Sequence, residues 1–114
     1  MLIEPGEKIH VIMRRAFESQ VRRHIAGEVI AASGSEVRVT GYVFVYDERS
    51  AQYVRKNFKR TTILDLASSG YIVNVIPQTI DLESVRYETI SRSELFFTDG
   101  KDYRLNINEF GIRR

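Results

Sequence analysis

Hydrophobic and polar residues alternate with a period of two through residues 36–47, EVRVTGYVFVYD. Side chains alternate across an extended strand, so this pattern gives the segment two different faces. The first face is aliphatic and consists of Val37, Val39, Gly41, Val43 and Val45. The second face is largely aromatic and consists of Arg38, Thr40, Tyr42, Phe44 and Tyr46. Because β-branched and aromatic residues suit a pleated, half-buried surface, we predict that residues 36–47 form the central strand of the protein.

Shorter segments of strand character fill most of the remaining chain, and residues typical of turns separate them. Pro77 cannot donate to a ladder, so it ends the strand before it or places that strand at an edge. Residues 81–84 are compatible with a single helical turn that has Asp81 as its N-cap. The predicted strands cover residues 8–17, about 21–32, 52–56, 61–66, 71–76 and 85–90, with two more inside 91–97 and 101–107.

Two segments fit a helix as well as a strand. In residues 18–32 a hydrophobic residue recurs every four positions from Phe17 to Val29, which would line one side of a helix. Gly27 weakens a helix by about 1 kcal/mol relative to alanine, and the turn at residues 33–35 leads directly into the central strand. We therefore predict a strand over residues 21–32. A short helix over residues 50–59 is the alternative to a strand over 52–56.

The last two strands are predicted to form a hairpin, and two loop lengths compete for its register. A two-residue Asp-Gly turn would place the apolar residues of the two strands on opposite faces of the hairpin. A three-residue loop with Gly100 in the left-handed conformation places them on one face, and burial of one face fixes register. We therefore predict the three-residue loop. Its expected pairs are Phe97 with Lys101, Leu95 with Tyr103, and Glu94 with Arg104.

These elements predict an all-β protein in which residues 1–114 form a single domain. Seven or eight short antiparallel strands at this spacing, with little helix, are typical of a small β-barrel or a compact sandwich. The meander of bent strands resembles SH3-like and Sm-like barrels in its architecture, although the sequence contains no motif of either family.

The composition excludes several kinds of chemistry. The 114 residues contain no cysteine, which rules out disulfides, thiolate metal sites and cysteine nucleophiles. No apolar run approaches the roughly 20 residues that a membrane-spanning helix needs, and the first residues do not resemble a signal peptide. We therefore expect a cytoplasmic protein that has no membrane partner.

No arrangement of residues in the sequence predicts catalysis, a metal site or a cofactor. His10 and His24 are each isolated, and His24 follows two arginines, which favours a surface or interface position. The glycines do not form a phosphate-binding motif, and no serine lies in a GxSxG sequence. The remaining candidate acids and bases lie in predicted turns, where local hydrogen bonds explain them: Asp47, Glu48, Asp81, Glu83, Asp99 and Asp102.

A basic segment with interleaved aromatic residues is the strongest indication of binding. Residues 49–60, RSAQYVRKNFKR, contain five Lys or Arg residues and no acidic residue. The net charge is +4 over residues 1–60 (eleven basic, seven acidic) and −2 over residues 61–114 (six basic, eight acidic). Cations bind backbone phosphates, and flat aromatic rings stack on unpaired bases. The candidate binding residues are Tyr42, Phe44, Tyr46, Tyr53, Arg55, Lys56, Phe58, Lys59 and Arg60.

Two binding functions follow from these residues. The first hypothesis is a non-catalytic protein-interaction or self-associating module, because an uncovered aromatic face would form an apolar patch that a monomer rarely tolerates. The alternative is weak, sequence-tolerant binding of RNA or single-stranded DNA. Asp47 and Glu48 at the start of the basic segment would repel a phosphate chain, which favours the first hypothesis. Exposure of Tyr42, Phe44 and Tyr46 beside the basic side chains of residues 49–60 distinguishes the two functions.

Overall fold

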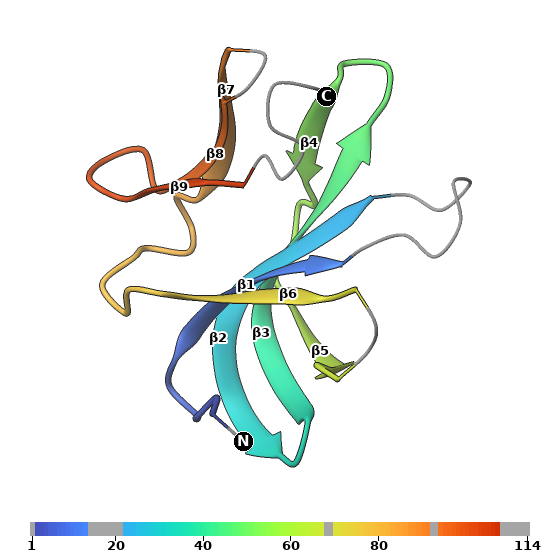
Figure 1. Ribbon diagram of the computed structural model, residues 1–114, viewed down its shortest axis with the longest axis vertical. Helices are drawn as coiled ribbons and strands as arrows, with labels where there is room; N and C mark the ends of the chain where they lie inside the picture. The colour runs from blue at the N-terminus through green and yellow to red at the C-terminus, as the bar shows by residue number, and fades with distance from the viewer. Residues whose placement is uncertain (1, 14–21, 68–69, 92–93, 108–114) are drawn as a thin grey trace. The chain divides into compact units, whose positions relative to one another are not determined.

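A computed structural model describes residues 2–13, 22–67, 70–91 and 94–107. Within these ranges the protein contains no helix and has nine antiparallel strands in two sheets (Figure 1). The chain divides into two compact units, residues 1–78 and 79–114, and the prediction of a single domain stays a prediction. The strands are β1 (Lys8–Met13), β2 (Arg23–Ser33), β3 (Glu36–Asp47), β4 (Gln52–Arg55), β5 (Arg60–Asp65), β6 (Ile72–Ile76), β7 (Arg86–Ser91), β8 (Glu94–Thr98) and β9 (Arg104–Asn106).

The first unit is a six-stranded sheet in the order β4-β3-β2-β1-β6, and β5 also pairs with β3. β2 and β3 form a long, bent hairpin at its centre (Figure 1). The far edge of β3 is divided between two strands, because β5 pairs with Glu36–Gly41 and β4 pairs with Phe44–Asp47. The predicted all-β class is confirmed, because the described residues form strands and no helix. The predicted barrel is not confirmed, because no ladder between described residues closes this sheet.

Most of the predicted strands are confirmed. β3 has the predicted bounds, and residues 23–33 form a strand rather than the competing helix. Residues 52–55 are likewise a strand, and β6 ends directly before Pro77. Residues 81–84 form a single hydrogen-bonded turn and no helix, and the Ser84 amide donates to the Asp81 carbonyl at 3.0 Å. Both carboxylate oxygens of Asp81 accept hydrogen bonds inside this turn, from the Glu83 amide and the Ser84 hydroxyl, each at 3.0 Å.

The aliphatic face of β3 lies in the core of the first unit. Val37, Val39 and Val43 are buried there. Neighbouring strands contribute further branched aliphatic side chains on the same face, and their burial supplies the main free energy that stabilises such a sheet. These side chains are Ile9 and Val11 on β1, Ile25 and Val29 on β2, and Leu64 on β5.

Two glycines lie directly opposite each other in the ladder between β2 and β3. Gly27 pairs with Gly41 in the β2–β3 ladder. A Cβ atom added to Gly41 would overlap the Ala26 carbonyl oxygen and the Gly27 Cα atom, both of which are backbone atoms. The two backbones can approach this closely only because neither residue carries a side chain.

The second unit, residues 79–114, contains a three-stranded sheet in the order β7-β8-β9. The predicted register of its last hairpin is wrong, because Phe97 pairs with Leu105 and Thr98 with Arg104. The loop therefore spans residues 99–103 rather than three residues, and Glu94 does not pair with Arg104. Two parts of the prediction hold: Phe97 and Leu105 share a face, and Gly100 has a φ of +79°.

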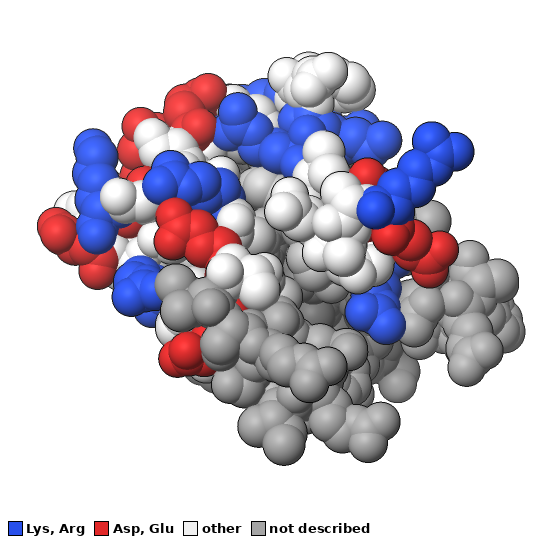
Figure 2. Space-filling view, turned by 90° about the horizontal axis from the view of Figure 1, so that it is seen from above, with Lys and Arg blue, Asp and Glu red and all other residues white. Residues whose placement is uncertain are grey.

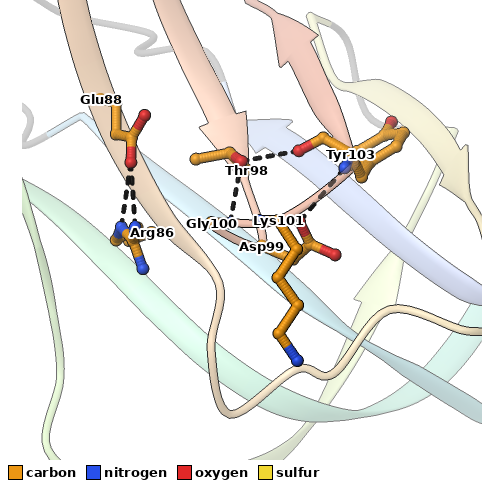
Figure 3. Close-up of polar contacts among 7 residues, drawn as sticks. All are labelled: Arg86, Glu88, Thr98, Asp99, Gly100, Lys101 and Tyr103. Atoms are coloured by element: carbon orange, nitrogen blue, oxygen red, sulfur yellow. Dashed lines mark hydrogen bonds and ion pairs between the residues drawn. The ribbon is translucent and has the colours of Figure 1, made fainter.

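Side chains hold this wider loop in place (Figure 3). Asp99 Oδ1 accepts hydrogen bonds from the amides of Lys101, at 2.8 Å, and Tyr103, at 3.2 Å. The Thr98 hydroxyl donates to the Tyr103 carbonyl at 2.6 Å and accepts from the Gly100 amide at 2.9 Å. These bonds satisfy backbone groups that a shorter loop would have placed in the ladder, so local side-chain chemistry determines the register.

Replacing Gly100 by valine is expected to destabilise the protein by about 1–3 kcal/mol, because a β-branched residue resists a positive φ. Gly100→Asn is the matched control, since asparagine tolerates the left-handed conformation, and we expect it to cost less than half as much. The measurement is the free energy of unfolding from urea denaturation. Equal losses for the two variants would show that crowding against the Arg86 guanidinium, rather than backbone strain, limits this position.

Candidate functional site

The aromatic face of β3 is largely buried. Tyr42 is 5% exposed and Phe44 is 1% exposed, whereas Tyr46 is half-buried. β1 and β2 extend this face, because His10 and Tyr42 both pair with Ala26 and His24 pairs with Phe44. The face therefore offers neither an open stacking platform at Tyr42 and Phe44 nor an uncovered apolar patch there.

The two histidines are neighbours, which the sequence analysis did not predict. Their ring centroids lie 5.3 Å apart in an edge-to-face arrangement, and both side chains are buried. The Tyr53 ring from β4 stacks on His24 at 4.4 Å. Of the expected surface or interface position for His24, the surface position is wrong, because His24 lies opposite Phe44 on the aromatic face and the Tyr53 ring covers it. The contact between the two histidines follows from the register in which β1 and β2 pair. The sequence of the connecting residues 14–21 does not predict that register.

Burial determines the protonation of this pair. It lowers the pKa of His10 to about 3, with repulsion from His24 as a smaller cause, and it lowers the pKa of His24 to about 4. Both rings are therefore neutral at neutral pH. The described residues contain no group of three or more His, Cys, Asp or Glu side chains that could hold a metal ion.

Residues 56–59 of the basic segment form an outward excursion between β4 and β5. Arg55 is paired with Phe44 and Arg60 with Gly41, so four residues, 56–59, lie opposite only two residues of β3. The chain must bow outward to accommodate the extra length. The amide of Lys56 still donates to the Val43 carbonyl at 2.9 Å, which fixes the start of the excursion.

Tyr42, one of the two residues opposite the excursion, anchors both of its ends. The Arg55 guanidinium lies 4.4 Å from the centroid of the Tyr42 ring, and the Lys59 ammonium lies 5.8 Å from the same centroid. Cations over an aromatic face are attracted by its quadrupole, worth roughly 0.5–1 kcal/mol each at exposed sites. Tyr42 thus holds two cations in place rather than offering its own ring to a ligand.

The tip of the excursion is open to solvent. Phe58 is 60% exposed, and residues 55–60 are all exposed. The Arg60 guanidinium lies 5.2 Å from the centroid of the Phe58 ring. One exposed aromatic ring therefore lies within a run of four cations, Arg55, Lys56, Lys59 and Arg60.

The acidic residue at the start of the basic segment serves the β3–β4 turn. Asp47 accepts hydrogen bonds from the Arg49 amide at 3.1 Å and from the Ser50 hydroxyl at 3.0 Å. On the face drawn in Figure 2, Lys and Arg side chains lie in groups with Asp and Glu side chains among them. The concentration of cations in residues 55–60 is thus a local feature.

Four contacts join most of the predicted binding residues into three groups. Tyr42 contacts Arg55 and Lys59, Phe58 contacts Arg60, and the rings of Tyr46 and Tyr53 lie 5.2 Å apart. Phe44 is buried beside them in the sheet, and Lys56 stands exposed in the excursion. The described residues form no helix, and so they include no helix that could span a membrane.

Comparisons of the chain with protein-family models, with curated proteins and with solved structures found no match.

Proposed function

We propose that this protein is a non-catalytic binding module that binds RNA or single-stranded DNA weakly and with little sequence preference. The observation that carries the proposal is the exposed excursion of residues 56–59, where four cations flank an exposed phenylalanine. Cations neutralise phosphates without regard to sequence, and an aromatic ring accepts any base. Burial of Tyr42 and Phe44 removes the aromatic face as a binding surface for either function, so the proposal is supported by the exposed excursion alone.

The dependence of binding on salt tests this proposal. Arg55, Lys56, Lys59 and Arg60 would neutralise about four phosphates, which implies a slope of log K against log salt near −3 for a single strand. The double replacement of Lys56 and Lys59 by glutamine is expected to reduce the magnitude of that slope by about 1.4. The measurement is a titration of labelled poly-U by fluorescence anisotropy at several salt concentrations.

The control is a double replacement of Arg22 and Arg38 by glutamine, two exposed arginines outside the basic segment. It removes the same charge, and we expect it to leave the slope nearly unchanged. A control that flattens the slope as much as the Lys56/Lys59 variant would mean that net charge, rather than the excursion, attracts the strand. The proposal is wrong if poly-U is not retained even at low salt.

A protein-interaction or self-associating module is the second candidate. It is supported by two exposed isoleucines, Ile63 at 61% and Ile30 at 47%, on the first sheet. Ile63 pairs with Arg38 of β3, and Ile30 is the unpaired residue at the register shift between Val29 and Ala31 of β2. Absence of poly-U binding together with a mass that rises with protein concentration in light scattering would favour this candidate.

Two finer assignments are part of the proposal. The first is that the six-stranded sheet belongs to the SH3-like or Sm-like type, which the antiparallel pairing of its consecutive strands β1 to β4 supports. The second is a cytoplasmic location, which the cysteine-free sequence supports.

A further inference from the structure

We propose that Phe58 stacks on one unpaired base of the bound strand, while Arg55 and Lys59, held over Tyr42, bind the phosphates on either side of that base. This inference rests on the proposed function and identifies the unit that the site recognises. It also gives Tyr42 a positioning role in place of direct contact with the ligand.

The first step of the argument concerns the geometry of the excursion. The chain leaves the edge of β3 after Arg55 and rejoins that edge at Arg60, only two β3 residues away. Arg55 and Lys59 therefore stand at the two ends of one narrow projection. Both cations lie over the same Tyr42 ring, at 4.4 and 5.8 Å from its centroid. A buried ring moves little, and it therefore reduces the conformational entropy that the two long side chains would lose on binding.

The second step concerns Phe58. A phenylalanine that serves only the fold is normally buried, whereas this ring keeps 60% of its surface exposed between the two anchored cations. The ring has no polar group with which to read base edges, so it can recognise a base only by stacking. The Arg60 guanidinium, 5.2 Å from the ring centroid, restrains the ring and adds a further positive charge beside it.

An abasic oligonucleotide provides the sharpest test, because it carries the same phosphates as a base-bearing strand but nothing to stack. We expect the protein to bind a labelled uridine oligomer roughly tenfold more tightly than an abasic oligomer of equal length, the low end of the range for one stacked base. Replacing Phe58 by alanine should abolish that preference and leave abasic binding unchanged. Phe58→Tyr is the matched control, and it should retain the preference because it keeps a flat ring.

The outcomes separate this inference from the proposed function. Equal affinity of the native protein for the two oligomers would overturn the stacking role of Phe58 while leaving phosphate binding intact. Absence of binding to both oligomers would overturn the proposed function and this inference together. If polyglutamate of the same charge competes as well as the uridine oligomer, the site accepts an acidic protein segment instead, and the inference is also overturned. Phe58 is exposed, so its variants are expected to keep the native circular dichroism spectrum.

Discussion

Replacing Gly41 by alanine is expected to destabilise the protein by about 3 kcal/mol or more, even though it adds only one methyl group. The added Cβ atom would overlap the Ala26 carbonyl oxygen and the Gly27 Cα atom, so the two central strands would have to separate at this pair. Overpacking against side chains typically costs 1–3 kcal/mol, and a backbone obstacle cannot be relieved by a change of rotamer. The measurement is the free energy of unfolding from urea denaturation.

Val43→Ala is the matched comparison, because Val43 lies two residues further along the same face of β3 and is buried in the core. Removing its two methyl groups is expected to cost about 1–3 kcal/mol through lost burial and the cavity left behind. Gly41→Ala should therefore be the more damaging of the two changes. A smaller loss for Gly41→Ala than for Val43→Ala would mean that the β2–β3 hairpin can relax at the Gly27–Gly41 pair without losing its ladder.

The second large effect is a loss of stability in mild acid. Burial lowers the pKa of His10 to about 3 and that of His24 to about 4, from 6.5 for each group when it is unperturbed. Between pH 6.5 and about 4 the unfolded chain therefore binds protons that the folded protein does not, and the free energy of unfolding falls as the pH falls. We expect a slope of about 1.4 kcal/mol per pH unit for each histidine between pH 6 and 5.

Urea denaturation at a series of pH values measures this slope. Replacing His24 by phenylalanine keeps a ring beside Tyr53 and should remove about half of the pH dependence between pH 6 and 5, whatever it does to stability at pH 7. The two carboxylates with a lowered pKa, Asp65 and Asp99, do not contribute to the slope in this window. Hydrogen bonds lower the pKa of Asp65 and Asp99 below 3.8, so their contribution is lost only in stronger acid. A free energy of unfolding that stays constant from pH 7 to pH 5 would contradict the burial of the histidine pair.

Hydrophobic periodicity was sufficient to predict the strands but insufficient to predict their pairing. Residues 36–47 alternate so regularly that both the bounds and the core face of β3 could be predicted from the sequence. The last hairpin shows the limit. Alternation correctly placed Phe97 and Leu105 on one face of the hairpin. However, sliding one strand past the other by two residues leaves the same side chains on that face, so alternation alone cannot choose between such registers. The hydrogen bonds of Thr98 and Asp99 decided among those registers, and no hydrophobic pattern reports them.

The candidate site was predicted in composition but not in arrangement. The basic residues and Phe58 were identified because a run of cations without acids is visible in the sequence. The burial of Tyr42 was not, since alternation identifies an aliphatic core face without telling whether the opposite, aromatic face is covered as well. His10 and His24 are fourteen positions apart in the sequence, and they meet only because β1 and β2 pair. That pairing is a tertiary property.

The divided edge of β3 has a consequence for how the protein can change. β4 and β5 run in the same direction along one partner strand, so the ends of the excursion are fixed by two independent ladders. Additional residues at its tip would leave both ladders intact, and doubling the length of a flexible loop costs only about 0.6 kcal/mol of closure entropy. The tip can therefore accept insertions or a grafted peptide without rebuilding the sheet, which makes it the natural place for ligand preference to diverge.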